Sequence, residues 1–134
     1  MVRETRLILT ETDFRLLTEF LMEDLHMPVY NRKKLQWKLK TARIVDKEWL
    51  PLNVVTTNSN VLVLNTTKNQ TFTVHIVSPE DYDGSSHQIL VSDPLAVALL
   101  GYSRGEDVEC ELPSGINRLK VLSVCQLSTG EVLV

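Results

Sequence analysis

The stretch Ile89–Asp107, ILVSDPLAVALLGYSRGED, is the part of the sequence that decides the fold. It opens with an apolar run, Ile89–Val91, which is typical of the end of a buried strand. Ser92 and Asp93 follow, and both residue types are good helix N-caps. Pro94 then stands at the first helical position, where a backbone amide has no intrahelical partner to lose. The pattern predicts a strand that leads through a capped turn into a helix.

The predicted helix is short and apolar on nearly every side, which indicates that it is buried. Its sequence after the proline is LAVALL, and Gly101 follows at the position where helices commonly end in a left-handed residue. The segment Gly105–Asp107 then turns the chain into another strand. This arrangement predicts the centre of a small α+β domain.

These residues resemble a known family. The pattern Ser-x-Pro-Leu-x-x-Ala-Leu-Leu-Gly-x-x-x-Gly-x-Asp, followed by Pro-x-Gly at Pro113–Gly115, is similar to the C-terminal domain of the GreA/GreB transcript-cleavage factors. It is more similar still to the family of the regulator of nucleoside diphosphate kinase, Rnk, whose members are short relatives of those factors. The similarity extends upstream through Val54–Ser59 and Val77–Pro79. With a weaker match in the N-terminal helices, it covers most of the chain.

Strand patterns on both sides of the helix complete the predicted fold. Apolar or alternating runs at residues 60–64, 70–77, 107–112 and 119–126 predict four or five antiparallel strands. The last run has apolar residues on both parities, which indicates a bulge or burial on both faces. The resemblance implies an FKBP-like domain for residues 53–134, preceded by a short antiparallel helical hairpin, a coiled coil, over residues 1–52.

Composition limits the classes of protein to which the chain can belong. Its 134 residues, 43% of them hydrophobic, are enough for one compact domain with an appendage. The formal net charge of −3 argues against a protein that binds nucleic acid through its whole surface. No apolar run approaches a membrane span, and the first residues do not lead into a signal peptide. We expect a cytoplasmic monomer that binds neither membranes nor specific DNA sequences.

The two cysteines, Cys110 and Cys125, lack the spacing of metal ligands. If residues 113–116 form a hairpin turn, residue 110 faces about residue 119, and the two thiols are not cross-strand partners. We expect both cysteines to be reduced and buried.

The N-terminal segment predicts two helices. Thr10 is a good cap for the first, with Asp13 at the third helical position. Pro28 breaks the pattern because it cannot continue a helix interior, and Asn31 is the expected cap of the second helix. Each helix has about 15 residues, so the arm is about 22 Å long.

Charge differs sharply between the two helices. The first helix carries acidic residues and the second carries basic ones, and an antiparallel pair would bring the two sets together. The acidic residues are Glu11, Asp13, Glu19, Glu23 and Asp24, and the basic residues are Arg32, Lys33, Lys34, Lys38, Lys40 and Arg43. The basic helix is therefore either a solvated face that complements its neighbour or a contact for nucleic acid or an acidic protein. Trp37 and Trp49 either seal the hairpin against the neighbouring domain, which we expect, or form a binding face.

The tip of the hairpin decides a functional question. The resemblance implies comparison with the Gre factors, in which a much longer coiled coil enters the secondary channel of RNA polymerase and two tip acids help to hold a catalytic magnesium ion. Here the tip offers Glu23 and Asp24, which point about 100° apart on a helix and suit a shared metal poorly. These residues are a solvated tip, a polymerase contact or, least in keeping with their geometry, a metal site.

The sequence contains no phosphate-binding glycine loop, nucleophile–base pair or metal-ligand cluster, so we expect no catalytic residues, no cofactor and no enzyme. The resemblance implies a transcription regulator that binds RNA polymerase at the rim of the secondary channel, against a coiled coil of the β′ subunit. Its contact residues fall here on Ser92, Asp93 and Pro94, which otherwise only begin a core helix. We expect binding without transcript cleavage, as in the Rnk family. The alternatives are a Gre-type cleavage and elongation factor that uses the tip acids, and a general protein-interaction module.

Overall fold

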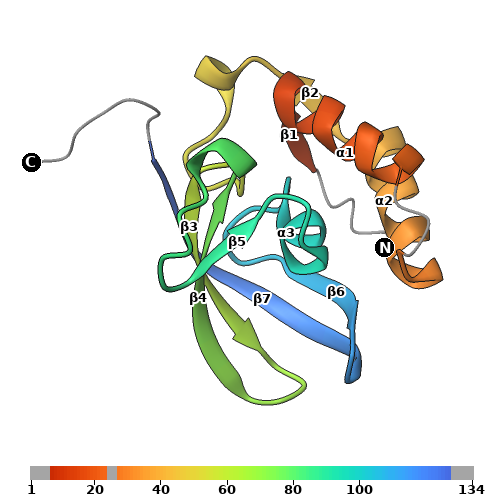
Figure 1. Ribbon diagram of the computed structural model, residues 1–134, viewed down its shortest axis with the longest axis vertical. Coiled ribbons are helices and arrows are strands. Elements are labelled where there is room, and N and C mark those ends of the chain that lie inside the picture. Colours follow the sequence, from red (N-terminus) through yellow and green to blue (C-terminus); the bar gives the residue numbers. More distant parts are fainter. Residues whose placement is uncertain (1–6, 24–26, 128–134) are drawn as a thin grey trace, which may run out of the picture.

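The computed structural model describes residues 7–23 and 27–127 and shows two helices packed beside a curled sheet (Figure 1). In chain order the elements are β1 (Ile8–Thr10), α1 (Glu11–Glu23), α2 (Val29–Thr41), β2 (Arg43–Val45), the 3-10 turn η1 (Lys47–Trp49), β3 (Ser59–Asn65), β4 (Gln70–Val77), the 3-10 turn η2 (Pro79–Asp81), β5 (Gln88–Leu90), α3 (Pro94–Leu99), β6 (Asp107–Leu112) and β7 (Gly115–Gln126). The α+β class, with a helical hairpin before a sheet that carries one short helix, is confirmed.

The main sheet has five strands in the order β5-β4-β3-β7-β6, and β1 and β2 form a separate parallel pair. The pairings among β3, β4, β6 and β7 are antiparallel. The sheet differs from the expected antiparallel arrangement at one edge, where β5 runs parallel to β4. After β4 the chain runs back beside this strand through η2 before β5 begins. Strand β5 can therefore run in the same direction as β4.

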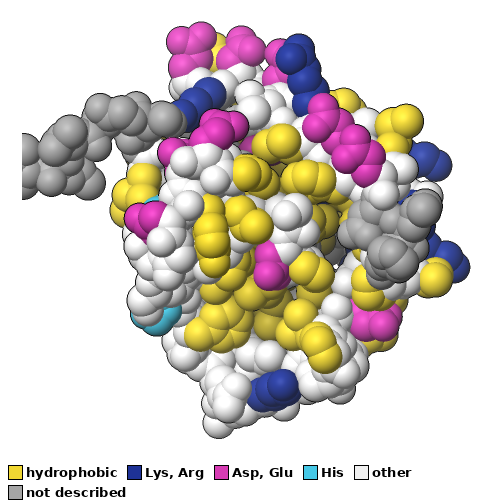
Figure 2. All heavy atoms as spheres, in the orientation of Figure 1, with side chains coloured by type: hydrophobic (Ala, Val, Ile, Leu, Met, Phe, Trp, Pro, Cys, Tyr) yellow, Lys and Arg dark blue, Asp and Glu magenta, His cyan; other side chains and the backbone are white. Residues whose placement is uncertain are grey.

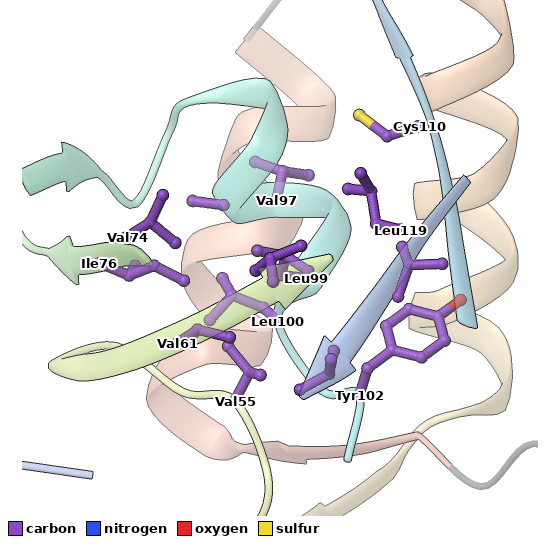
Figure 3. Close-up of a cluster of buried hydrophobic side chains, with 14 of the residues drawn as sticks. Val55, Val61, Val74, Ile76, Val97, Leu99, Leu100, Tyr102, Cys110 and Leu119 are labelled. Carbon is purple, nitrogen blue, oxygen red and sulfur yellow. The ribbon is translucent and has the colours of Figure 1, made fainter. Parts of the chain in front are cut away.

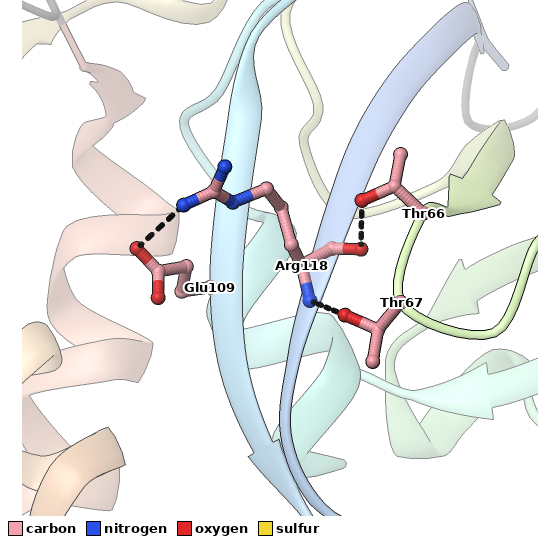
Figure 4. Close-up of polar contacts among 4 residues, drawn as sticks. All are labelled: Thr66, Thr67, Glu109 and Arg118. Atoms are coloured by element: carbon pink, nitrogen blue, oxygen red, sulfur yellow. Dashed lines mark hydrogen bonds and ion pairs between the residues drawn. The ribbon is translucent and has the colours of Figure 1, made fainter.

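The turns between strands set the register. The β6–β7 turn is tight, because Leu112 pairs with Gly115, whose φ is 117°. Cys110 therefore faces Asn117, and the expectation that it would face a residue near 119 is wrong by two positions. At the same end of the sheet, the β3–β4 turn is tied to β7: Thr66 Oγ1 donates to the Arg118 carbonyl at 3.0 Å, and the Arg118 amide donates to Thr67 Oγ1 at 2.9 Å (Figure 4).

The predicted bulge in the last strand is confirmed. The register of β7 against β3 shifts between the pairs Leu62–Ser123 and Val63–Val121. As a result Val124 packs against the core, whereas Cys125 is exposed, so the expectation that both cysteines are buried is wrong for Cys125. Both thiols are free.

Helix α3 is built as its sequence predicts. The Asp93 side chain accepts a hydrogen bond from the Leu95 amide at 2.9 Å, and Pro94 occupies the first turn. Gly101 has a φ of 92°, and a Cβ there would lie 3.0 Å from Leu9 Cδ2. The end of the helix therefore requires glycine both for its backbone conformation and for the close approach of β1. Figure 3 shows Leu99 and Leu100 beside side chains of the sheet in the core.

The two N-terminal helices share this core. Leu7, Leu9, Leu17 and Leu35 are at most 1% exposed and belong to the same buried cluster as the sheet residues. The hairpin therefore lies against the sheet rather than projecting from it (Figure 1). A boundary between residues 52 and 53 remains a prediction.

Two expectations about the hairpin are wrong. Asn31 does not cap α2, because the helix begins two residues earlier, after Pro28; Asn31 is instead buried against β6. Trp37 and Trp49 do not seal the hairpin, since their exposed fractions are 44% and 74%. The core between the helices and the sheet is formed by other side chains, among them Leu17, Leu35 and Val97. The expected cap of α1 is confirmed, because the Asp13 amide donates to Thr10 Oγ1 at 3.1 Å.

Candidate functional site

The predicted contact residues lie together at the start of α3. Ser92 and Pro94 are exposed, and Asp93 is half-buried because it caps the helix. The Asp93 amide donates to the Leu90 carbonyl at 2.9 Å, which fixes the turn to the end of β5. Figure 2 shows apolar side chains gathered on this face of the molecule, over the region where Figure 1 places β5 and α3. The turn is thus a rigid, exposed feature beside an apolar surface.

The other end of α3 is held by Lys38, which comes from the last turn of α2. The Lys38 Nζ donates to the carbonyls of Val97, Ala98 and Leu100 at 2.6, 3.0 and 2.7 Å. The last carbonyls of a helix have no intrahelical partners and carry a partial negative charge. The three hydrogens of one ammonium group therefore satisfy three of them.

The environment of Lys38 is nearly free of solvent, since the residue is only 3% exposed. Burial lowers the pKa of Lys38 to about 7 from its ordinary value of 10.5. The three carbonyls oppose that lowering, because only the protonated amine has three hydrogens to donate. The Tyr102 ring lies 5.3 Å from Nζ, and burial raises the pKa of Tyr102 to about 12.

The basic helix was predicted to be either a solvated face or a contact surface, and neither prediction holds for Lys38, which is buried. Its position contains the signal that could have identified it. Leu35, Lys38, Leu39 and Ala42 recur at spacings of three and four residues, so Lys38 lies within the apolar stripe of its helix. A lysine inside such a stripe needs buried acceptors.

A second buried polar contact joins α1 to the segment that leads into β3. Asp13 is 1% exposed and accepts from Thr56 Oγ1 at 2.5 Å and from Thr57 Oγ1 at 2.6 Å. A third joins α2 to β6: Asn31 Nδ2 donates to the Glu111 carbonyl, and Asn31 Oδ1 accepts from the Glu111 amide, both at 2.9 Å. These contacts fix the hairpin on the sheet. The sequence gives no indication of them, since the partners are 43 to 80 residues apart.

Between α2, α3 and β6 lies a cavity of about 110 Å³. Its wall is mainly apolar, and Ser92 and Pro94 of the predicted contact turn also line it. Lys34 and Glu109 contribute the charged groups beside Lys38. The cavity therefore adjoins the turn.

The predicted tip residues are only partly described. Glu23 is exposed and ends α1, and Asp24 lies outside the described residues. Each helix has 13 residues, so the arm is about 20 Å long. Within residues 7–23 and 27–127 no group of three or more His, Cys, Asp or Glu residues is placed to hold a metal ion. In the same part of the chain no helix is long and apolar enough to cross a membrane.

Comparison with known proteins identifies the family. The family model for the C-terminal part of the transcription elongation factors GreA and GreB matches residues 50–126. The elongation factor GreA of Helicobacter hepaticus is 36% identical over 86 residues, which are 64% of this chain and 53% of that protein. GreA of Caldanaerobacter subterraneus is 32% identical over 90 residues, 67% of this chain and 57% of that protein. The chain thus corresponds to a little more than half the length of these relatives.

A solved structure supports the same assignment. The GreA/GreB elongation factor of Nitrosomonas europaea is 31% identical and superposes with a TM-score of 0.65, covering 91% of this chain and 99% of that one. The relatives are named elongation factors, which favours the predicted alternative, a Gre-type factor, over the narrower Rnk assignment. Because the family model covers more than half of the sequence and the fold agrees along nearly all of it, the chain belongs to the GreA/GreB transcription elongation factor family.

Proposed function

We propose that this protein is a Gre-type transcription factor that binds RNA polymerase, docking at the rim of the secondary channel against the coiled coil of the β′ subunit. Membership of the GreA/GreB family supports the partner. The contact residues are Ser92, Asp93 and Pro94. The observation that carries this assignment is the rigid, exposed turn at the start of α3, which Asp93 caps and Lys38 supports from the far end of the helix.

The protein binds the polymerase without stimulating transcript cleavage, as the Rnk family does. The short hairpin supports this part of the proposal. Its helices are 13 residues long and pack on the protein's own sheet through the buried contacts of Asp13, Asn31 and Lys38. An arm held in this way stays near the entrance of a channel. Binding there alters the access of longer factors.

A Gre-type cleavage factor is the second candidate. The names of the relatives favour it, since they are transcription elongation factors. This function needs the tip acids, Glu23 and Asp24, to reach the active centre of the polymerase. A general interaction module is the third, and it predicts no affinity for the polymerase at all.

The binding proposal can be tested with purified RNA polymerase and fluorescently labelled protein. Ser92→Arg places a long cation on the exposed turn without removing the cap, and we expect it to weaken binding at least about tenfold, which is ~1.4 kcal/mol. Asp93→Asn keeps an N-cap but removes the charge, and Pro94→Ala loosens the turn. We expect both to weaken binding several-fold.

The matched control is Lys68→Ala, on the exposed β3–β4 turn. We expect this variant to bind like the wild type. Equal binding by all four variants would show that the turn is not the contact. An absence of binding by the wild-type protein would reject the polymerase as partner.

A further inference from the structure

The cavity between α2, α3 and β6, here called the α2–α3 pocket, is a built feature of the fold. Its apolar wall consists of Met27, Leu35, Val97, Ala98, Tyr102 and Val108. Its size is near that of the engineered cavity of about 150 Å³ that takes up benzene. The pocket is therefore large enough for a branched aliphatic side chain.

Polar contacts keep the walls of the pocket apart. Lys38 joins α2 to the end of α3 through three carbonyls, and Asn31 joins α2 to β6 through both backbone groups of Glu111. Because these bonds fix α2 against both neighbours, the helix cannot move inward to close the space without breaking them. The bonds therefore hold the walls of the pocket at this separation.

The position and charge of the pocket indicate what enters it. Ser92 and Pro94 line both the pocket and the proposed docking turn, so a partner on the turn also covers the pocket. Lys34 lies at the pocket, and Lys33 and Lys40 are exposed on the same helix, which has no acid between Val29 and Thr41. The acid at the pocket, Glu109, lies 4.0 Å from Arg118. The flank on the α2 side is thus basic.

We propose that the α2–α3 pocket receives an aliphatic side chain of the docking partner, and that an acidic residue beside this side chain faces Lys34. This inference rests on the proposed polymerase contact and deepens it. The sheet supplies the turn and one wall, whereas the hairpin supplies the opposite wall and the basic flank. The hairpin is therefore part of the surface that docks on the polymerase, in addition to lying near the entrance of the channel.

The test fills the pocket from within. Ala98→Leu adds three carbons to a wall residue of α3, and we expect it to weaken polymerase binding at least about tenfold while the melting temperature is unchanged or raised. Lys34→Glu reverses the flank charge at a half-buried position and is expected to weaken binding several-fold, with Lys68→Glu as the matched control. If Ala98→Leu lowers the melting temperature, its weaker binding could reflect unfolding, and Lys34→Glu then provides the test.

The outcomes separate this inference from the proposed function. If the wild type binds polymerase and both variants bind equally well, the pocket is not used, although the docking proposal stands. If the wild type does not bind, both proposals fail together. Analytical sedimentation of the free proteins tests whether a second copy of the chain occupies the pocket instead. If the wild type is a dimer and Ala98→Leu is a monomer, a second copy fills the pocket and the inference is overturned. Native mass spectrometry that finds a co-purified small molecule on the wild type but not on Ala98→Leu would also overturn it.

Discussion

Replacing Lys38 with methionine is expected to lower the free energy of unfolding by about 2–4 kcal/mol. Methionine keeps much of the side-chain volume but cannot donate to the carbonyls of Val97, Ala98 and Leu100. Those carbonyls then remain buried without their donor, and the end of α3 loses a positive charge. Urea denaturation measures the change.

Lys40→Met is the matched control for this substitution. It removes the same charge from the exposed face of the same helix, and we expect a change within about 0.5 kcal/mol. If both variants lose the same small amount, Lys38 does not hold α3.

The same pair of proteins tests the pKa of Lys38. Its value is about 7 in the folded protein, against 10.5 ordinarily. Between these values the unfolded chain binds more protons than the folded protein, so this residue makes the free energy of unfolding rise with pH across that window. The stability difference between wild type and Lys38→Met should therefore be larger at about pH 9 than at about pH 7. A difference that stays constant over this range would mean that the carbonyls outweigh burial and keep the amine protonated in the folded protein.

Replacing Asp13 with alanine is expected to cost about 2–4 kcal/mol of unfolding free energy. The carboxylate accepts the hydroxyls of Thr56 and Thr57 in a site that is almost closed to water. Its removal leaves these donors without their acceptor and loosens α1 from the segment that leads into β3. Thermal or urea unfolding measures the loss.

The control for Asp13 is Glu19→Ala, which removes an exposed acid from the same helix. We expect it to be nearly neutral. A double-mutant cycle with Thr57→Val then isolates the hydrogen bond, and a coupling free energy near zero would contradict the contact.

The sequence predicts well those parts of the fold in which the residues that form a feature are close together along the chain. The cap at Asp93, the proline after it and the glycine at 101 are local signals, and each appears in the structure as expected. The bulge in β7 is also visible as a break in alternation.

The predictions that are wrong concern contacts between distant segments. Asn31 is a plausible cap by its neighbours, yet its partner is Glu111 in β6. Lys38 lies in the apolar stripe of its helix, which indicates burial, but only the position of α3 supplies the carbonyls to which it donates. Trp49 is a large apolar residue, but the core between helices and sheet is formed without it. No local pattern specifies which surface a neighbouring element will cover.

The contacts between the hairpin and the rest of the protein also bear on its function. The hairpin is short, and its second helix, α2, holds α3 and borders the pocket beside the docking turn. The central claim is that the hairpin serves binding at the entrance of the polymerase and does not take part in the reaction inside it.

The most direct test is transcript cleavage by stalled elongation complexes, with the protein at concentrations that saturate the polymerase. The account predicts that the wild-type protein leaves the cleavage rate unchanged while it displaces a cleavage-competent Gre factor. Accelerated cleavage by the wild type that is lost in the Glu23→Ala/Asp24→Ala variant would contradict it.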